Sequence, residues 1–166
     1  MECEQLFALL YLDPVDRLVK EKLRIQHYVR YVDDCVLVHE SREYLKECLA
    51  QIGRLCEGKL KLRLNAKTQI FPVKNGVDFL GFHTYLTETG AVIRKVRRDS
   101  VKRMKRKLKF FERKYAKEEM DVEAVRRSVV SWLGHAEFGN TYGLRKRLIG
   151  KLVLTREAGK NESKKR

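Results

Sequence analysis

Two adjacent carboxylates, Asp33 and Asp34, lie between two β-forming runs in the segment QHYVRYVDDCVLVHE, residues 26–40. The runs are rich in Val and Tyr, so they predict a β-hairpin with the aspartates at its tip. A turn is one of the few places where neighbouring carboxylates can converge on one region. Asp is also a common turn residue with no further role. Two adjacent acids also repel each other, so a bound cation would relieve the repulsion, and the pair is a candidate for part of a cation site.

Helices and a strand are expected to surround this hairpin. Apolar spacing predicts a helix over about residues 2–22, with a kink at Pro14. After the hairpin, Ser41 is expected to cap a second helix that ends at Gly58. The following KLKLRLN, residues 59–65, alternates strictly between Leu and Lys or Arg, which predicts a half-buried strand.

Further β-structure is predicted for residues 68–96. Asn75-Gly76 is a strong tight-turn signal within it, and Thr89-Gly90 is a weaker one. We therefore expect the first part of the chain to be a mixed structure of antiparallel hairpins and packed helices.

Helices are predicted beyond Arg94. One apolar stripe has spacings of 3, 4, 3 and 4 residues, and it consists of Val101, Met104, Leu108, Phe111 and Tyr115. A second helix is predicted over residues 121–138, and a third around Leu144 and Leu148. The expected organisation is an α+β half over residues 1–95, an all-helical half over 96–150 and a flexible basic tail over 151–166, with the two halves closely packed.

The chain of 166 residues is strongly basic, with 37 Lys+Arg against 22 Asp+Glu, a net charge of +15 and a pI near 9.8. Between Arg94 and Lys114 we count twelve bases against two acids, Asp99 and Glu112. These bases fill the positions that the apolar stripe leaves over. Bases that are so weakly opposed by acids predict a surface that contacts phosphates rather than a merely solvated one.

Composition also argues against several other classes of protein. No apolar run reaches membrane-spanning length, and the N-terminus carries acids where a secretory signal carries bases, so a soluble, cytoplasmic protein is expected. The four histidines show no paired spacing that would suggest zinc. The four cysteines lack CxxC spacing, and we expect them to be reduced core residues.

Tyr31-Val32-Asp33-Asp34 forms a Tyr-x-Asp-Asp motif at the tip of the predicted hairpin. This motif resembles the signature of bacterial retroelement reverse transcriptases, those of group II introns and diversity-generating elements. RYVDDCVLV, LRLNAKTQIF, VDFLGFHTY and SWLGHAEFGNTYGLRKRL follow in the family's order, from about Gln5 to Leu148. EQLFALLYLDPVDRLV is similar to the segment before the signature, although Glu4 replaces the Ser of the usual Ser-Gln pair.

The resemblance implies an RNA-directed DNA polymerase, a nucleotidyltransferase that acts on an RNA template, a DNA primer and dNTPs with two Mg²⁺ ions. Residues 1–95 would be the second half of a palm, and residues 96–150 a thumb. The fingers and an earlier palm strand that carries a third Asp are not recognised in the chain. We therefore expect little or no polymerase activity from it alone, and a further chain as the source of those parts.

The resemblance also assigns roles to individual residues. Asp33 would be a metal ligand, with Asp34 as a second contributor, and Lys67 would protonate or neutralise the departing pyrophosphate. Gln5 would lie near the incoming nucleotide and template, and Tyr31 beside the primer end. The primer grip would be Phe79, Leu80, Gly81 and Phe82, and the residues expected on the nucleic-acid backbone are Arg98, Lys102, Arg103, Lys105, Arg106, Lys109, Arg145, Lys146 and Arg147.

Plainer interpretations stay open for these residues. Lys67 is also one Lys among many, Tyr31 also suits sheet packing, and FLGF also suits a core strand. Trp132 and His135 are more typical of helix contacts than of ligands. A second hypothesis for the whole chain is a noncatalytic nucleic-acid-binding remnant, or a subunit of a split reverse transcriptase. An acidic-membrane binder is disfavoured because the basic helix has few large apolar residues outside its packing stripe.

Overall fold

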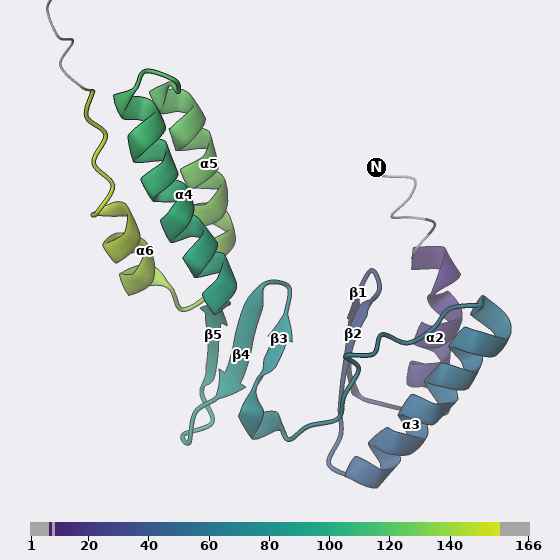
Figure 1. Ribbon diagram of the computed structural model, residues 1–166. Helices are drawn as coiled ribbons and strands as arrows, with labels where there is room; N and C mark the ends of the chain where they lie inside the picture. Colours follow the sequence, from purple (N-terminus) through teal and green to yellow (C-terminus); the bar gives the residue numbers. More distant parts are fainter. Residues whose placement is uncertain (1–6, 8, 157–166) are drawn as a thin grey trace, which may run out of the picture. The chain divides into compact units, whose positions relative to one another are not determined.

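The computed structural model describes Phe7 and residues 9–156, and it forms two compact units, residues 1–73 and 74–166 (Figure 1). The fold class is α+β, as predicted: small antiparallel sheets with packed helices are followed by a helical region. None of the helices in the described ranges combines the length and apolar character needed to cross a membrane.

The described part of the first unit is built around a two-stranded antiparallel hairpin and two helical segments, residues 13–22 and 42–60. Each helical segment is an α-helix that continues directly into a π-helical turn. The elements are α2 (Asp13–Arg17), η1 (Leu18–Lys22), β1 (His27–Tyr31), β2 (Asp34–Val38), α3 (Arg42–Leu55) and η2 (Cys56–Leu60). Ser41 caps α3 as predicted, because its Oγ accepts a hydrogen bond of 3.1 Å from the Tyr44 amide.

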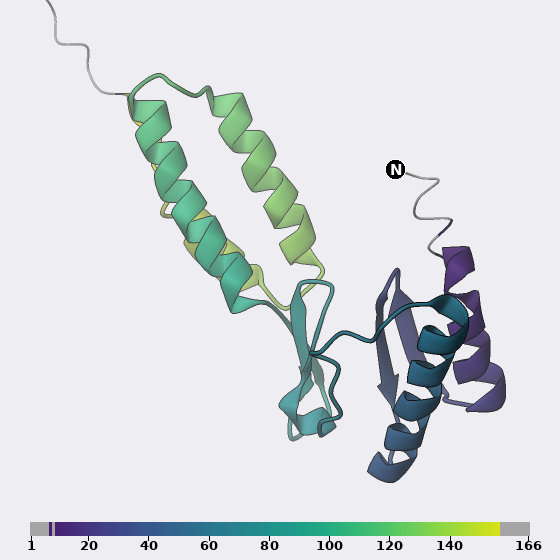
Figure 2. The same ribbon diagram turned by 45° about the vertical axis from the view of Figure 1, so that its right-hand side comes forward.

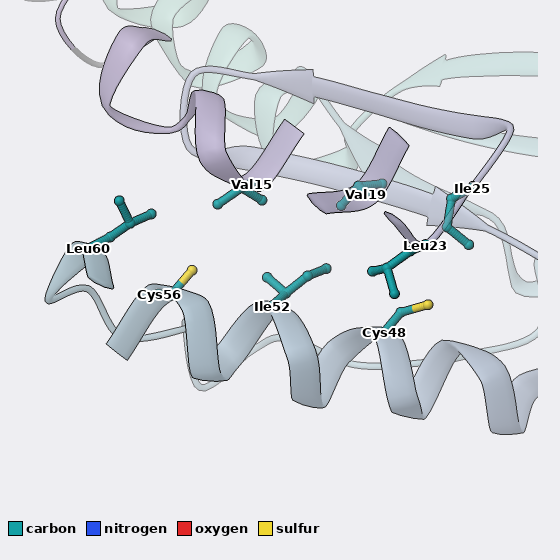
Figure 3. Packing of buried hydrophobic residues seen from close by; sticks show 8 residues of the cluster. All are labelled: Val15, Val19, Leu23, Ile25, Cys48, Ile52, Cys56 and Leu60. Carbon is teal, nitrogen blue, oxygen red and sulfur yellow. The ribbon is translucent and has the colours of Figure 1, made fainter. Parts of the chain in front are cut away.

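The core of this unit lies between its two helical segments (Figure 3). Apolar positions of α3 and η2 point toward those of α2, η1 and the turn that follows, as Figure 3 shows. Tyr28 and Leu37, from the two strands, pack on the same cluster. One face of the hairpin is therefore fastened to the helices. The buried members are Val15, Val19, Leu23, Ile25, Cys48, Ile52, Cys56 and Leu60.

The strand predicted over residues 59–65 is wrong. The chain instead continues the α3 helix through η2 as far as Leu60, which is buried among the helices, and Lys61 ends it with a φ of 54°. No described strand pairs with residues 61–65. Alternation of Leu with bases is not sufficient for a strand, because a ladder also needs a backbone partner.

The second unit combines a three-stranded sheet with three helices. The strands are β3 (Val77–Phe79), β4 (Phe82–Leu86) and β5 (Val92–Val96), antiparallel in that order. The helices are α4 (Arg98–Ala116), α5 (Val122–Glu137) and α6 (Tyr142–Ile149). Figure 2 shows α4 and α5 as antiparallel neighbours joined by a short loop.

The two expected turns of this sheet have different outcomes. Gly90 lies in the β4–β5 loop, as predicted. Asn75-Gly76 does not join two strands, because Asn75 ends a short 3-10 helix, η3 (Val73–Asn75), that precedes β3. The bend between β3 and β4 is Leu80-Gly81, as the pairing of Phe79 with Phe82 requires.

Two apolar clusters hold the second unit together. Met104, Leu108 and Phe111 of α4 pack on α5 and α6. Phe82 and Val96 of the sheet are buried with Ala136 of α5. The sheet and the helices thus share a core, and the division into palm and thumb at residue 96, which concerns function, stays a prediction.

The segment after α6 was expected to be a flexible tail. Leu152 and Leu154 are partly buried against the cluster of α4, α5 and α6. Residues 157–166 lie outside the described residues. The cysteine expectation is confirmed for Cys48 and Cys56, which are free and buried, and it is wrong for Cys35, which is exposed.

Candidate active-site hairpin and basic helix

The predicted hairpin around the two aspartates is present, and its register places each carboxylate. Tyr31 pairs with Asp34 at the end of the ladder, so the bend consists of Val32 and Asp33. Asp33 therefore lies in the bend itself, and Asp34 is the first residue of β2. Both aspartates are exposed. The backbone of Val32 has a φ of 54°, an unfavourable conformation for a β-branched residue.

An Arg from β1 fixes this bend to a helix. Arg30 donates from Nε to one Asp16 oxygen at 2.9 Å and from Nη2 to the other at 2.5 Å. Its Nη1 donates to the Val32 carbonyl at 2.7 Å. The Tyr28 hydroxyl adds a 2.7 Å bond to Asp16. One guanidinium thus joins α2, β1 and the strained residue of the bend.

The charges in this cluster shift one another's titration. The hydrogen bond from Arg30 lowers the pKa of Asp16, although partial burial acts in the opposite direction. The same bond raises the pKa of Arg30. Burial, and then the bond to Asp16, raise the pKa of Tyr28. The cluster is therefore fully formed with Asp16 ionised and Tyr28 protonated.

The two faces of the hairpin differ in character. Tyr28 and Arg30 contact the helical side, so the alternating residues Val29 and Tyr31 point away from it, and both are exposed. Paired residues share a face, which places Asp34 with Tyr31 on the open side. The open face thus carries an aromatic ring and a carboxylate next to the bend.

The donor set at the bend suits a hard cation in part. Asp33 and Asp34 supply carboxylate oxygens, the ligands that Mg²⁺ takes from proteins along with substrate phosphates and water. Within the described ranges, no group of three or more His, Cys, Asp or Glu residues could hold a metal ion. Two exposed carboxylates alone are a weak site, so tight binding would require oxygens from a substrate or another segment.

Two other residues were expected near the nucleotide, Lys67 and Gln5. Lys67 is exposed in a turn in which the Asn65 side chain accepts a 3.0 Å bond from its amide and the Asn65 carbonyl accepts a 2.9 Å bond from Thr68. It does not follow a strand, contrary to the prediction. Gln5 lies outside the described residues.

The four residues expected to form the primer grip make the tight β3–β4 hairpin. Leu80 and Gly81 have φ values of 50° and 84°, as in a type I′ bend. A Cβ at Gly81 would lie 2.9 Å from the His135 ring, so this position requires Gly for two reasons. Leu80 is exposed and Phe82 is buried. The tip of this tight hairpin therefore exposes an apolar side chain, Leu80.

The basic face of α4 is continuous. Its buried positions, Met104, Leu108 and Phe111, occupy one side, and exposed bases occupy most of the rest. In the described part of the chain, Lys114 is the one base of α4 that forms an ion pair, with Glu119. The exposed bases without such a pair are Arg98, Lys102, Arg103, Lys105, Arg106, Lys107, Lys109 and Arg113.

Helix α6 carries the remaining expected backbone contacts. Lys146 and Arg147 are exposed, and Arg145 pairs with Glu137 at 3.1 Å. Arg145 is therefore less available to a phosphate than its neighbours. Nothing in the sequence distinguished it from them, because its partner precedes it by eight residues on another helix.

The Asp16–Arg30 pair was not predicted from the sequence. A signal was present, because alternation along β1 places Arg30 on the same face as Tyr28, where the helices pack. A buried guanidinium requires a carboxylate. Asp16, in the preceding helix next to the buried Val15, was the available candidate.

Comparison with known families supports the resemblance for the first half of the chain. Residues 6–84 match the family described as reverse transcriptase (RNA-dependent DNA polymerase). This segment contains the Asp33–Asp34 hairpin, Lys67 and the β3–β4 bend. The match is to the reverse transcriptase family in general and does not distinguish a subtype such as group II introns. No curated protein matches the chain significantly.

Proposed function

We propose that this chain provides the metal-binding hairpin, primer grip and thumb of an RNA-directed DNA polymerase of the bacterial retroelement type. The observation that carries the proposal is the bend at Asp33, which Arg30 fastens to α2 inside the segment similar to reverse transcriptases. In this proposal residues 1–95 act as part of a palm and residues 96–150 as a thumb.

The chemistry would depend on Mg²⁺ held by Asp33 and Asp34 together with substrate oxygens. When bound, the ions supply charge that lowers the pKa of the primer hydroxyl and stabilises the leaving pyrophosphate. Tyr31 would position the primer end from the open face, and Lys67 would neutralise the pyrophosphate. Gln5 would contact the nucleotide.

The nucleic acid would be an RNA–DNA hybrid gripped by its backbone. The eight unpaired bases of α4 suit phosphates, which fix position without reading sequence. Leu80 at the tip of the β3–β4 hairpin would press on the primer. Fingers and a third carboxylate, from a further segment or from another chain, would complete the enzyme.

Mg²⁺ binding tests the proposal. We expect Mg²⁺, titrated in the presence of hybrid and dNTP, to perturb the amide signals of the bend in the full chain. Asp33→Asn combined with Asp34→Asn should abolish the perturbation. Glu43→Gln, at an exposed acid of α3, is the control and should not. Equal behaviour of the two variants would refute a metal site at the bend.

The second candidate is a noncatalytic nucleic-acid-binding remnant or a subunit of a split enzyme. It is favoured by the basic face of α4 together with the small carboxylate set at the bend. Hybrid binding with steep salt dependence and no Mg²⁺ effect would support the remnant. Primer extension that appears only when a fingers-bearing chain is added, and that requires Asp33, would support the split enzyme.

A further inference from the structure

The connection between α5 and α6 is held rigidly against the sheet. Asn140 pairs with the backbone of Arg94 in both directions, because its amide donates to the Arg94 carbonyl at 2.7 Å and its side-chain oxygen accepts from the Arg94 amide at 2.9 Å. The buried Thr141 hydroxyl donates to the Ala136 carbonyl at 2.5 Å. Gly139 lies so close to Arg94 and Phe82 that an added Cβ would approach them to 2.7 and 2.9 Å.

Two aromatic side chains flank this rigid connection and point into solvent. Phe138 is 74% exposed and Tyr142 is 73% exposed, the highest values among the large apolar side chains in the described ranges. Single exposed apolar residues are ordinary on protein surfaces. Here the two rings lie at the two ends of a connection whose backbone is already fixed. Binding a ligand would therefore cost little conformational entropy.

Each ring has a base beside it. Arg94 donates from Nη1 to the Phe138 carbonyl at 3.4 Å. Lys146 follows Tyr142 by four residues, which places both on the same face of α6. Glu137, the acid adjoining Phe138, is engaged by Arg145 at 3.1 Å. Neither Arg94 nor Lys146 forms an ion pair with a described acid. Exposed aromatic rings beside such cations suit a polyanion that also offers flat apolar surfaces.

We propose that Phe138 and Tyr142 form a stacking site for unpaired bases of a single-stranded nucleic acid, with Arg94 and Lys146 at its phosphates. Every base has a π-face, so such a site binds with little sequence preference. The site lies wholly in the second unit and needs no metal, so it stands or falls independently of the chemistry proposed for Asp33.

Binding of two probes by the full chain tests the site. One probe is a fluorescently labelled oligothymidylate, and the other is a backbone of equal length that lacks bases. We expect Phe138→Ala with Tyr142→Ala to weaken thymidylate binding by roughly 5- to 150-fold for each stacked base. Binding of the base-free backbone should change less than about twofold, because its contacts are electrostatic.

Matched variants separate stacking from other causes. Phe138→Tyr with Tyr142→Phe keeps both rings and should retain thymidylate affinity, whereas Phe138→Leu with Tyr142→Leu should lose it. Val122→Ala with Val130→Ala removes exposed apolar groups from α5 and should have no effect. Full affinity in the Leu variant would show that stacking is not needed, and equal losses on both probes would show that the bases are not contacted. Either result would overturn the proposal.

A duplex arm distinguishes this site from the basic face of α4. Blunt RNA–DNA hybrid offers no unpaired bases, so the Phe138 and Tyr142 variants should bind it like the wild type. Loss of hybrid binding in the Ala variant would contradict the assignment to single strands. If neither the wild type nor any variant bound the hybrid, the proposed thumb would be contradicted, and the thymidylate result would be unaffected.

Discussion

Asp16 on α2 accepts both hydrogen bonds of the Arg30 fork on β1, and the same guanidinium holds the carbonyl of Val32. A two-stranded hairpin alone is only marginally stable. The position of the Asp33 bend therefore depends on this pair as well as on the apolar contacts of Tyr28 and Leu37.

Replacing Arg30 with Ala should destabilise the first unit by about 2–3 kcal/mol, because it leaves Asp16 partly buried without its cation. The Arg30 side chain is only 9% exposed. Arg17, which is 69% exposed in its pair with Asp13, is the control, and Arg17→Ala should cost about 0.3–0.5 kcal/mol. Urea titration followed by circular dichroism measures both, and similar losses would show that the fork does not anchor the hairpin.

Acid should weaken the same anchor. The folded-state pKa of Asp16 lies below its ordinary value of 3.8, so the ionised form stabilises the fold above that pH. The stabilisation is lost as the pH falls through the folded-state pKa. We expect the stability difference between wild type and Asp16→Asn to shrink between about pH 5 and about pH 2 in denaturation experiments. A difference that stays constant over this range would contradict the shift.

Gly139→Ala should destabilise the second unit by about 1–3 kcal/mol, because the added methyl group would push Arg94 or Phe82 away. Gly134 is a matched control inside α5, where an added Cβ would have no neighbour within 4 Å apart from the adjoining backbone of its own helix. Gly134→Ala should stabilise the helix by about 0.5–1 kcal/mol. Thermal unfolding of the two variants should shift in opposite directions, and shifts of the same sign would disprove the close contact.

Removing two bases from α4 should flatten the salt dependence of hybrid binding. Lys102→Ala with Arg106→Ala is expected to reduce the slope of log K against log salt by about 1–2, if both contact phosphates. Arg126→Ala with Arg127→Ala removes the same charge from exposed positions of α5 and should change the slope less. Equal effects would mean that net charge, rather than the face of α4, governs binding.

Elements with a strong periodic pattern were predictable from the sequence. The apolar stripe of α4 depends only on local residue spacing, and the Ser41 cap of α3 depends on a single side chain. Both predictions were confirmed. The hairpin around Asp33 was also predictable, since β-formers on both sides left one place for the bend. Among the proposed site residues, local sequence patterns correctly predicted that the two aspartates lie at the tip of a hairpin and that the bases lie on α4.

Features that depend on distant partners were not predictable in the same way. Residues 59–65 alternate like a strand, but Leu60 is buried against helices and no described strand pairs with the rest. Asn75-Gly76 has the stronger turn chemistry, yet strand pairing puts the bend at Leu80-Gly81. The Asn140 bonds to Arg94 join residues 46 apart, which local patterns do not reveal.

The bonds between Asn140 and Arg94 extend the hydrogen-bonding pattern of β5 into the connection between α5 and α6. Tilting the helices away from the sheet would break these bonds and expose Phe82 to water. The spacing between the basic face of α4 and the β3–β4 bend at Leu80-Gly81 is therefore fixed by contacts within the protein itself. If the proposed function holds, an RNA–DNA duplex would therefore have to fit this fixed spacing rather than reshape it.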